Sequence, residues 1–207
     1  MQLLVYILIY PILWIISILP FPIFYLFSDF ICFLTYNIIG YRKKVVRANI
    51  KLALPHLSDK ERFAIEKKFY SHMCDMFLEM IKTITISQKE IEKHFTFSNM
   101  EVYYELEKKN KSIALMCAHY ASYEWVISMN YYIHCKGFGI YKKLSNPYFD
   151  KLVKRIRSKF KAELITTKQT IPTIAENHKN HVLGIYGFAS DQSPKARSAY
   201  HWAPFMG

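Results

Sequence analysis

The sequence predicts an α/β protein in which an N-terminal membrane anchor helix and a helical segment precede a mostly parallel sheet flanked by helices. Residues 1–19 carry no charged side chain and approach the length that a bilayer-spanning helix needs. Residues 54–82 repeat apolar side chains at helical spacing. After Lys111, short apolar runs alternate with helical patterns, which is typical of parallel sheets. We therefore expect three regions, which are an anchor and interfacial helix (1–41), a helical segment (42–110) and an α/β layer (111–207).

The anchor is predicted to stay uncleaved, because the chain lacks a positively charged start and a small-residue cleavage site. Pro20 and Pro22 end the first apolar helix. A second apolar stretch, residues 21–40, could also span a membrane, but Asp29 makes a buried or interfacial helix at least as good an interpretation. The basic residues of "YRKKVVR" follow, and the positive-inside rule places them and the main body in the cytoplasm.

Charge is unevenly distributed along the 207 residues, which carry a net charge of +12. Asp29 is the only charged residue in residues 1–41, so all 28 Lys and Arg residues lie beyond them. An apolar head on a basic body favours a membrane and an anionic partner over the simpler interpretation of general solubility. Membrane lipid is thus an expected partner, and we expect no nucleic acid.

Neither a metal nor a cofactor is expected. The four cysteines form no C-x-x-C pair and are interpreted as reduced core residues. The chain contains no P-loop and no G-x-G-x-x-G after a strand, and its six glycines leave little room for a nucleotide cradle. A serine hydrolase is also unsupported, because no G-x-S-x-G elbow is present.

The polar residues of the α/β layer follow the predicted strands. Strands are predicted at 112–118, 138–144, 162–166 and 181–189, and helices at 122–135, 147–160 and 169–178. Ligands of such sheets bind beyond the carboxyl ends of the strands. The residues at or just beyond strand ends are therefore expected to converge on one rim: His119, Lys142, Lys143, Asp191 and Gln192.

His119 precedes Glu124 by five positions in "LMCAHYASYEW". A continuous helix would turn about 500° over that distance and keep the two side chains apart. The pair makes sense if His119 ends a strand and Glu124 lies in the first turn of a helix. Glu124 could then hold one ring nitrogen while the other takes a proton from a hydroxyl. The alternative is a histidine that merely caps a helix.

The predicted helix 147–160 is strongly basic and carries Lys151, Lys154, Arg155, Arg157 and Lys159. Such a surface could hold phosphates or an acidic carrier protein. A solvated amphipathic face explains most of the same charges.

Taken together, these stretches resemble the lipid A biosynthesis late acyltransferases, the lauroyl/myristoyl transferase family. The resemblance runs through "YRKKVVRANIKLALPHLSDKER", "FLEMIK", "AHYASYEW", "NPYFDKLVKRIRSKF" and "SDQSPKARSAYHWAPFMG". The family's H-x-x-x-x-[DE] motif falls on His119 and Glu124. Its Asn-Pro block, arginine motif and "DQ" motif fall on Asn146, Pro147, Asp150, Arg155, Arg157, Asp191 and Gln192.

The resemblance implies a glycerolipid-acyltransferase-like fold and transfer of an acyl chain from acyl carrier protein to a hydroxyl of a phosphorylated glycolipid, at the cytoplasmic face of the bacterial inner membrane. It implies His119 as general base and Glu124 as the group that orients it. Arg157, helped by Arg155 and by Lys142 or Lys143, would bind an acceptor phosphate or stabilise the oxyanion. Asn146, Asp191 and Gln192 are expected to bind substrate.

Two alternatives stay open at this point. One is an acyltransferase that acts on a lysophospholipid or aminolipid. The other is a non-catalytic membrane-anchored protein that uses its basic face for binding. Members of the family usually continue beyond "PFMG", so we also expect the α/β layer to be incomplete relative to the family.

Overall fold

The computed structural model describes residues 1–191, and these residues fall into two compact units. One unit contains residues 16–82. The other combines residues 1–15 with residues 83–191. Gln192, one of the predicted site residues, lies outside the described residues.

The unit of residues 16–82 is helical. It contains α2 (Phe21–Phe33), the π-helix η1 (Leu34–Ile39), α3 (Lys43–Ala53) and α4 (Asp59–Lys82). Pro20 caps α2, and Gly40 ends η1 with φ of 65°, a left-handed conformation that glycine adopts without steric cost. Buried carboxylates of α4 tie the helices together, since Tyr25 donates to Glu79 at 2.8 Å and Arg47 pairs with Glu66 at 2.9 Å.

The described helix that is long and apolar enough to cross a membrane is Phe21–Ile39, which comprises α2 and η1. Helix α1 (Gln2–Ile18) is apolar but has only 17 residues. From the sequence, the first stretch was expected to be the anchor and the second was left open. The second stretch is the better candidate because η1 continues α2 without a break through Asn37 to Gly40.

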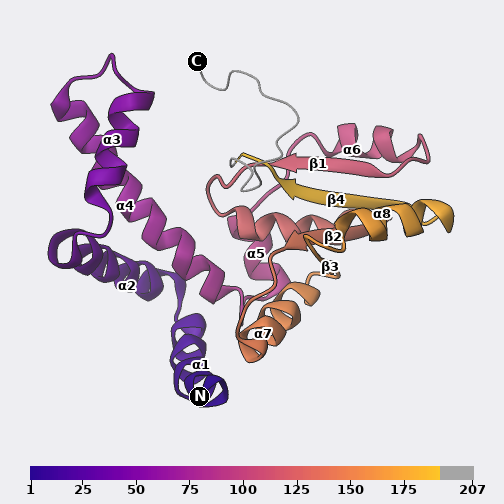
Figure 1. Cartoon of the computed structure of the whole chain (residues 1–207), viewed down its shortest axis with the longest axis horizontal. Helices are drawn as coiled ribbons and strands as arrows, with labels where there is room; N and C mark the ends of the chain where they lie inside the picture. The colour runs from indigo at the N-terminus through magenta and orange to yellow at the C-terminus, as the bar shows by residue number, and fades with distance from the viewer. Residues whose placement is uncertain (192–207) are drawn as a thin grey trace. The chain divides into compact units, whose positions relative to one another are not determined.

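The other unit contains a four-stranded parallel sheet of order β1-β4-β2-β3 (Figure 1). Its strands are β1 (Ile113–Cys117), β2 (Lys136–Tyr141), β3 (Glu163–Thr166) and β4 (Gly184–Ala189). The register pairs Cys117 with Ala189, so β1 and β4 end side by side. The predicted α/β class with a mostly parallel sheet is confirmed.

Helices surround this sheet. They are α5 (Gln88–His94), α6 (Met100–Glu107), the 3₁₀ helix η2 (Tyr123–Tyr131), α7 (Pro147–Ser158) and α8 (Thr170–Lys179). The segment predicted as helix 122–135 is therefore helical over a shorter range and is wound as a 3₁₀ helix.

The two faces of the sheet differ. On one face, Phe138 stacks on Tyr186 with ring centroids 4.8 Å apart, and Ile165 packs with them against Ile174 of α8. This face is a closed core. The other face carries Leu115, Cys117, Ile185 and the small residues of β2 and β4, and it is where the candidate site forms.

Candidate active site

His119 lies just beyond the end of β1, at the carboxyl rim of the sheet. Ala121 has φ of 49°, in the left-handed region, and the chain turns there before η2 begins at Tyr123. Glu124 thus occupies the first turn of a helix while His119 follows a strand. The predicted bend between the two residues is confirmed.

The carboxylate that holds the His119 ring is Asp191. The ring nitrogen Nδ1 lies 2.7 Å from Asp191 Oδ1, and the backbone N–H of His119 donates to Oδ2 at 2.9 Å. The expectation that Glu124 would orient His119 is thereby corrected, since no hydrogen bond joins these two residues in the described part of the chain. Because Cys117 of β1 is in register with Ala189 of β4, the residues two positions beyond each strand end meet.

Two contacts support this arrangement. Ser190 N donates to Cys117 O at 3.0 Å, so the pairing of the strands continues past their ends. The ring of Tyr123 lies edge-on to the His119 ring with centroids 4.8 Å apart. The hydrogen bond from the His119 side chain, followed by that from its backbone, lowers the pKa of Asp191, which favours the carboxylate form.

Glu124 pairs with Arg157 instead. Nη2 of Arg157 lies 2.8 Å from Oε1 and 2.6 Å from Oε2 of Glu124. Both side chains are largely buried, at 21% exposed for Arg157 and 15% for Glu124. Nε and Nη1 of Arg157 make no hydrogen bond within residues 1–191, so these two donors remain available to a ligand.

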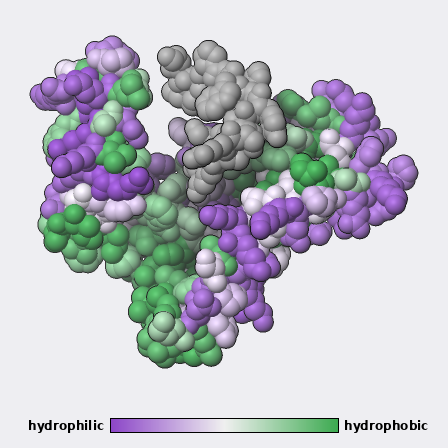
Figure 2. All heavy atoms as spheres, in the orientation of Figure 1, coloured by the Kyte–Doolittle hydropathy of each residue, from purple (hydrophilic) through white to green (hydrophobic). Residues whose placement is uncertain are grey.

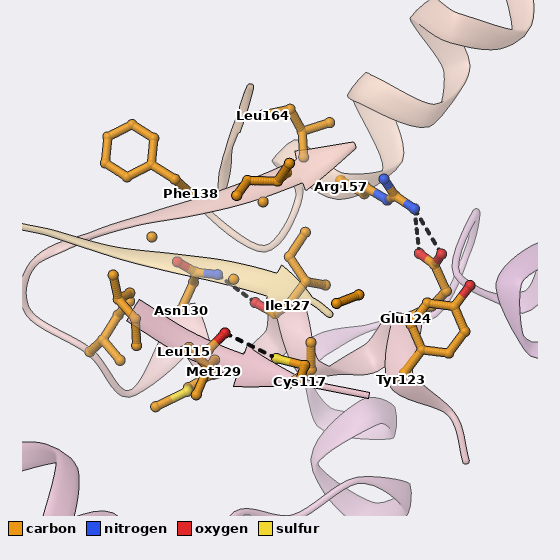
Figure 3. Close-up of a pocket in the computed structure, with 18 of the residues that line it drawn as sticks. Leu115, Cys117, Tyr123, Glu124, Ile127, Met129, Asn130, Phe138, Arg157 and Leu164 are labelled. Carbon is orange, nitrogen blue, oxygen red and sulfur yellow. Dashed lines mark hydrogen bonds and ion pairs between the residues drawn. The ribbon is translucent and has the colours of Figure 1, made fainter. Parts of the chain in front are cut away.

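A cavity of about 520 Å³ lies over the open face of the sheet. Its volume falls within the usual range for ligand pockets. Glu124 and Arg157 lie at one end, and the other drawn lining residues are mostly apolar (Figure 3). Sheet residues form its floor and η2 contributes to the opposite wall. The main floor residues are Leu115, Cys117, Gly137, Gly139, Leu164, Ile185 and Gly187.

Glycines make room for the cavity. A Cβ at Gly187 would meet its nearest atom only at 3.8 Å, so this floor position is open. At Gly137, a Cβ would lie 1.6 Å from Oδ1 of Asn130, so the wall closes on the sheet there. These glycines and Asn130 were not expected from the sequence, although the spacing of the two glycines in "KGFGIY" indicates a close approach to a strand.

His119 stands at the edge of this cavity. It does not itself line the cavity, but Ala118, Tyr120 and Tyr123 do. Its side chain is 32% exposed and that of Asp191 is 28% exposed, so a substrate can reach the pair. A titratable ring held by a carboxylate beside an apolar cavity can remove a proton from a hydroxyl of an amphipathic substrate.

The remaining predicted site residues are more dispersed. Asn146 caps α7 by accepting from the backbone N–H of Tyr148 at 3.0 Å, and its side-chain amide donates to Gln2 O at 3.2 Å. Lys142, Lys143 and Arg155 are exposed. Within residues 1–191, no three His, Cys, Asp or Glu side chains gather as metal ligands.

The sequence matches a known family. The family model described as bacterial lipid A biosynthesis acyltransferase matches residues 1–207, which is every residue of the sequence. No curated protein matches the sequence.

Proposed function

The chain belongs to the bacterial lipid A biosynthesis acyltransferase family, and we propose that it moves a fatty acyl chain from an acyl thioester to a hydroxyl of a lipid A precursor. Membership of the family makes it an enzyme that acts by acyl transfer and is associated with a membrane. The observation that carries the proposal is the His119–Asp191 pair at the edge of an apolar cavity.

In the proposed reaction, the free ring nitrogen Nε2 of His119 takes the proton of the acceptor hydroxyl. The hydroxyl oxygen attacks the thioester carbonyl, a carbon–oxygen bond forms and the carbon–sulfur bond breaks. The proton then passes from His119 to the departing thiolate. Asp191 fixes the ring orientation and stabilises the imidazolium that forms between the two proton transfers.

The guanidinium of Arg157 would stabilise the negative charge that develops on the thioester carbonyl oxygen. Its Nε and Nη1 donors are not used by Glu124, and the Glu124 carboxylate holds the guanidinium in place. Fixed donors in a site that excludes water stabilise an oxyanion strongly. The apolar remainder of the cavity would hold the acyl chain.

The partners follow from charge. Lys142, Lys143 and Arg155 are exposed, and no carboxylate pairs with them in the described part of the chain. Such a surface complements an acidic acyl carrier protein as donor and a phosphorylated glycolipid as acceptor. Asn146, at the start of α7, and Gln192 are also proposed to contribute to substrate binding. Arg42, Lys43 and Lys44 follow the candidate span, which supports the cytoplasmic face of the inner membrane.

The test is acyl transfer by membranes that contain His119→Ala, supplied with acyl carrier protein thioester and lipid A precursor. We expect transfer to be lost while the protein stays in the membrane. His134→Ala is a matched control, because Nδ1 of His134 also pairs with a carboxylate, Glu107 at 2.8 Å, away from the cavity. Undiminished transfer by His119→Ala would refute the assigned base.

A second test concerns the acceptor, because a lysophospholipid or aminolipid would suit the same pair of residues. In a strain that lacks the gene, we expect lipid A to be under-acylated. An unchanged lipid A acylation pattern would exclude the lipid A precursor as acceptor.

A further inference from the structure

Within the unit that contains the sheet, called the catalytic unit below, aromatic side chains attach helix α1 to α7. Tyr6 stacks on Tyr10 with ring centroids 5.3 Å apart. Tyr6 also lies 5.8 Å from the ring of Tyr148 and 5.3 Å from that of Phe149, both in the first turn of α7. Asn146, the cap of α7, donates to Gln2 O. Figure 1 shows α1 beside the start of α7.

The attachment uses one stripe of α1 and leaves the rest of the helix uncovered. Tyr6, Tyr10 and Leu13 are partly buried, and their spacing places them on one face. The other faces are apolar and exposed, for example Leu4 at 61%, Leu8 at 62% and Ile12 at 58%. Figure 2 colours this lower end of the molecule as hydrophobic. A helix that is apolar all round is stable where its surroundings are apolar.

Basic residues adjoin the attachment point. Lys151 is exposed and follows Tyr148 by three positions, so the two are neighbours on the surface of α7. Lys142 and Lys143 are exposed in the segment that leads into α7. Cations placed next to an apolar helix match the phosphates of anionic lipids next to the acyl chains.

We propose that α1 and the start of α7 together form a surface that seats the catalytic unit on a bilayer containing anionic phospholipid. Helix α1 lies among the acyl chains, and Lys151 lies at the phosphates. Helix α7 carries Tyr148 and Phe149 in its first turn and Arg157 in its last. The aromatic contact therefore fixes the depth of the catalytic site, and α1 is more than a loose tether. The proposal rests on the proposed function in taking the reaction to be acyl transfer to a membrane lipid.

Tryptophan quenching tests where α1 lies. Trp14 of α1 is 45% exposed, whereas Trp125 is 2% exposed in the catalytic unit. The full chain is reconstituted in vesicles of phosphatidylcholine and phosphatidylglycerol with brominated acyl chains. We expect the bromine atoms to quench the fluorescence of Trp14, so that the wild-type protein is quenched more than the Trp14→Phe variant. Equal quenching of the wild-type protein and Trp14→Phe would overturn the proposal. The readout needs no acyl transfer, so it stands even if the assigned reaction is wrong.

Loss of the aromatic contact tests the coupling. In the double variant Tyr6→Ala with Phe149→Ala, we expect the membrane-bound fraction to be unchanged. Transfer to an acceptor in vesicles should fall at least several-fold, while transfer to a short, water-soluble alcohol is retained. Tyr104→Ala is the control, because its ring packs on Tyr103 and His134 in the same unit without touching α1. Wild-type transfer in vesicles by the double variant would contradict the proposed coupling.

The headgroup contact is tested with Lys151→Glu. With phosphatidylglycerol in the vesicles, transfer by this variant should be several-fold slower than that of the wild-type protein. In vesicles of phosphatidylcholine alone, the two proteins should differ less. The same ratio of rates in both kinds of vesicle would refute the part of the proposal that assigns anionic lipid.

Discussion

At the scale of single residues, two carboxylates have partners other than those expected from the sequence. Asp191, expected to bind substrate, holds His119, and Glu124, expected to hold His119, binds Arg157. The sequence was sufficient to place His119 and Asp191 at one rim of the sheet, and the resemblance implied functional roles for Glu124 and Arg157. It was not sufficient to pair them, because the partner of His119 depends on which strand lies next to β1. Strand order is set by packing across the whole layer.

The Asp191→Asn variant should lower kcat by about 10²-fold, the smaller end of what acid–base groups usually contribute. The amide keeps the size of the side chain but does not stabilise an imidazolium. KM for the thioester should change little, since Asp191 touches His119 and does not line the cavity. Steady-state kinetics on purified protein measure both constants. If the variant kept the kcat of the wild-type protein and had a higher KM, Asp191 would instead be a substrate-binding residue.

At the scale of secondary structure, the glycines of β2 and β4 shape the cavity. The alternation of strands and helices in this region was predictable from hydrophobic runs. The cavity was not, because it depends on η2 lying over the sheet, and a 3₁₀ helix has no distinct signature in the apolar spacing of "YEWVISMNY".

The Gly187→Val variant should shift the preference towards shorter acyl donors. The added side chain meets open space on the cavity floor, and valine suits a strand. If the cavity is shortened by about one methylene group, kcat/KM for the longest donor should fall about 10-fold or more. A series of thioesters of increasing length measures the shift. Gly137→Val serves as the contrast, since Asn130 leaves no room there and folded protein should be lost. An unchanged length profile in Gly187→Val would place the acyl chain elsewhere.

The junction of α6 and β2 supplies a pH-dependent prediction. Glu107 accepts from Tyr103 Oη at 2.6 Å and from Cys135 N at 3.1 Å, and its Oε2 lies 2.8 Å from Nδ1 of His134. Burial raises the pKa of Glu107, but these hydrogen bonds outweigh it and the net pKa falls below 4.5. The stabilisation is thus present above pH 4.5 and is lost as pH falls through the lower folded pKa.

Glu107→Gln should therefore destabilise the protein at pH 7 and do so less as the pH is lowered below 4.5. Thermal unfolding in detergent at a series of pH values measures the difference in stability from the wild-type protein. A difference that does not depend on pH would show that the charge of Glu107 contributes nothing at this junction.

At the scale of the whole molecule, the chain combines a helical unit that contains a candidate span with a catalytic unit that carries its own apolar helix. The α/β class, the apolar head and the basic body were predictable from composition and order. The choice between the two apolar stretches was not, because hydropathy alone does not show that η1 extends α2 to Ile39.

Membrane orientation can be tested with Lys44→Cys, since Lys44 is exposed and follows the candidate span. If the basic end of the span is cytoplasmic, an impermeant maleimide should label this cysteine in inverted vesicles but not in intact spheroplasts. The wild-type protein gives the background from the four native cysteines, of which Cys74 is buried. Labelling in intact spheroplasts would place this end on the other side of the membrane.

The central claim is that Asp191 acts through His119, and a double-mutant cycle in acyl transfer tests it most directly. The rates of His119→Ala, Asp191→Asn and the double variant are compared with the rate of the wild-type protein on the same thioester and acceptor. If Asp191 acts only by holding the base, Asp191→Asn should be slower than the wild-type protein. The double variant should be no slower than His119→Ala alone. The claim would be contradicted if the rate losses of the two single variants multiplied in the double variant. Full activity in His119→Ala would also contradict it.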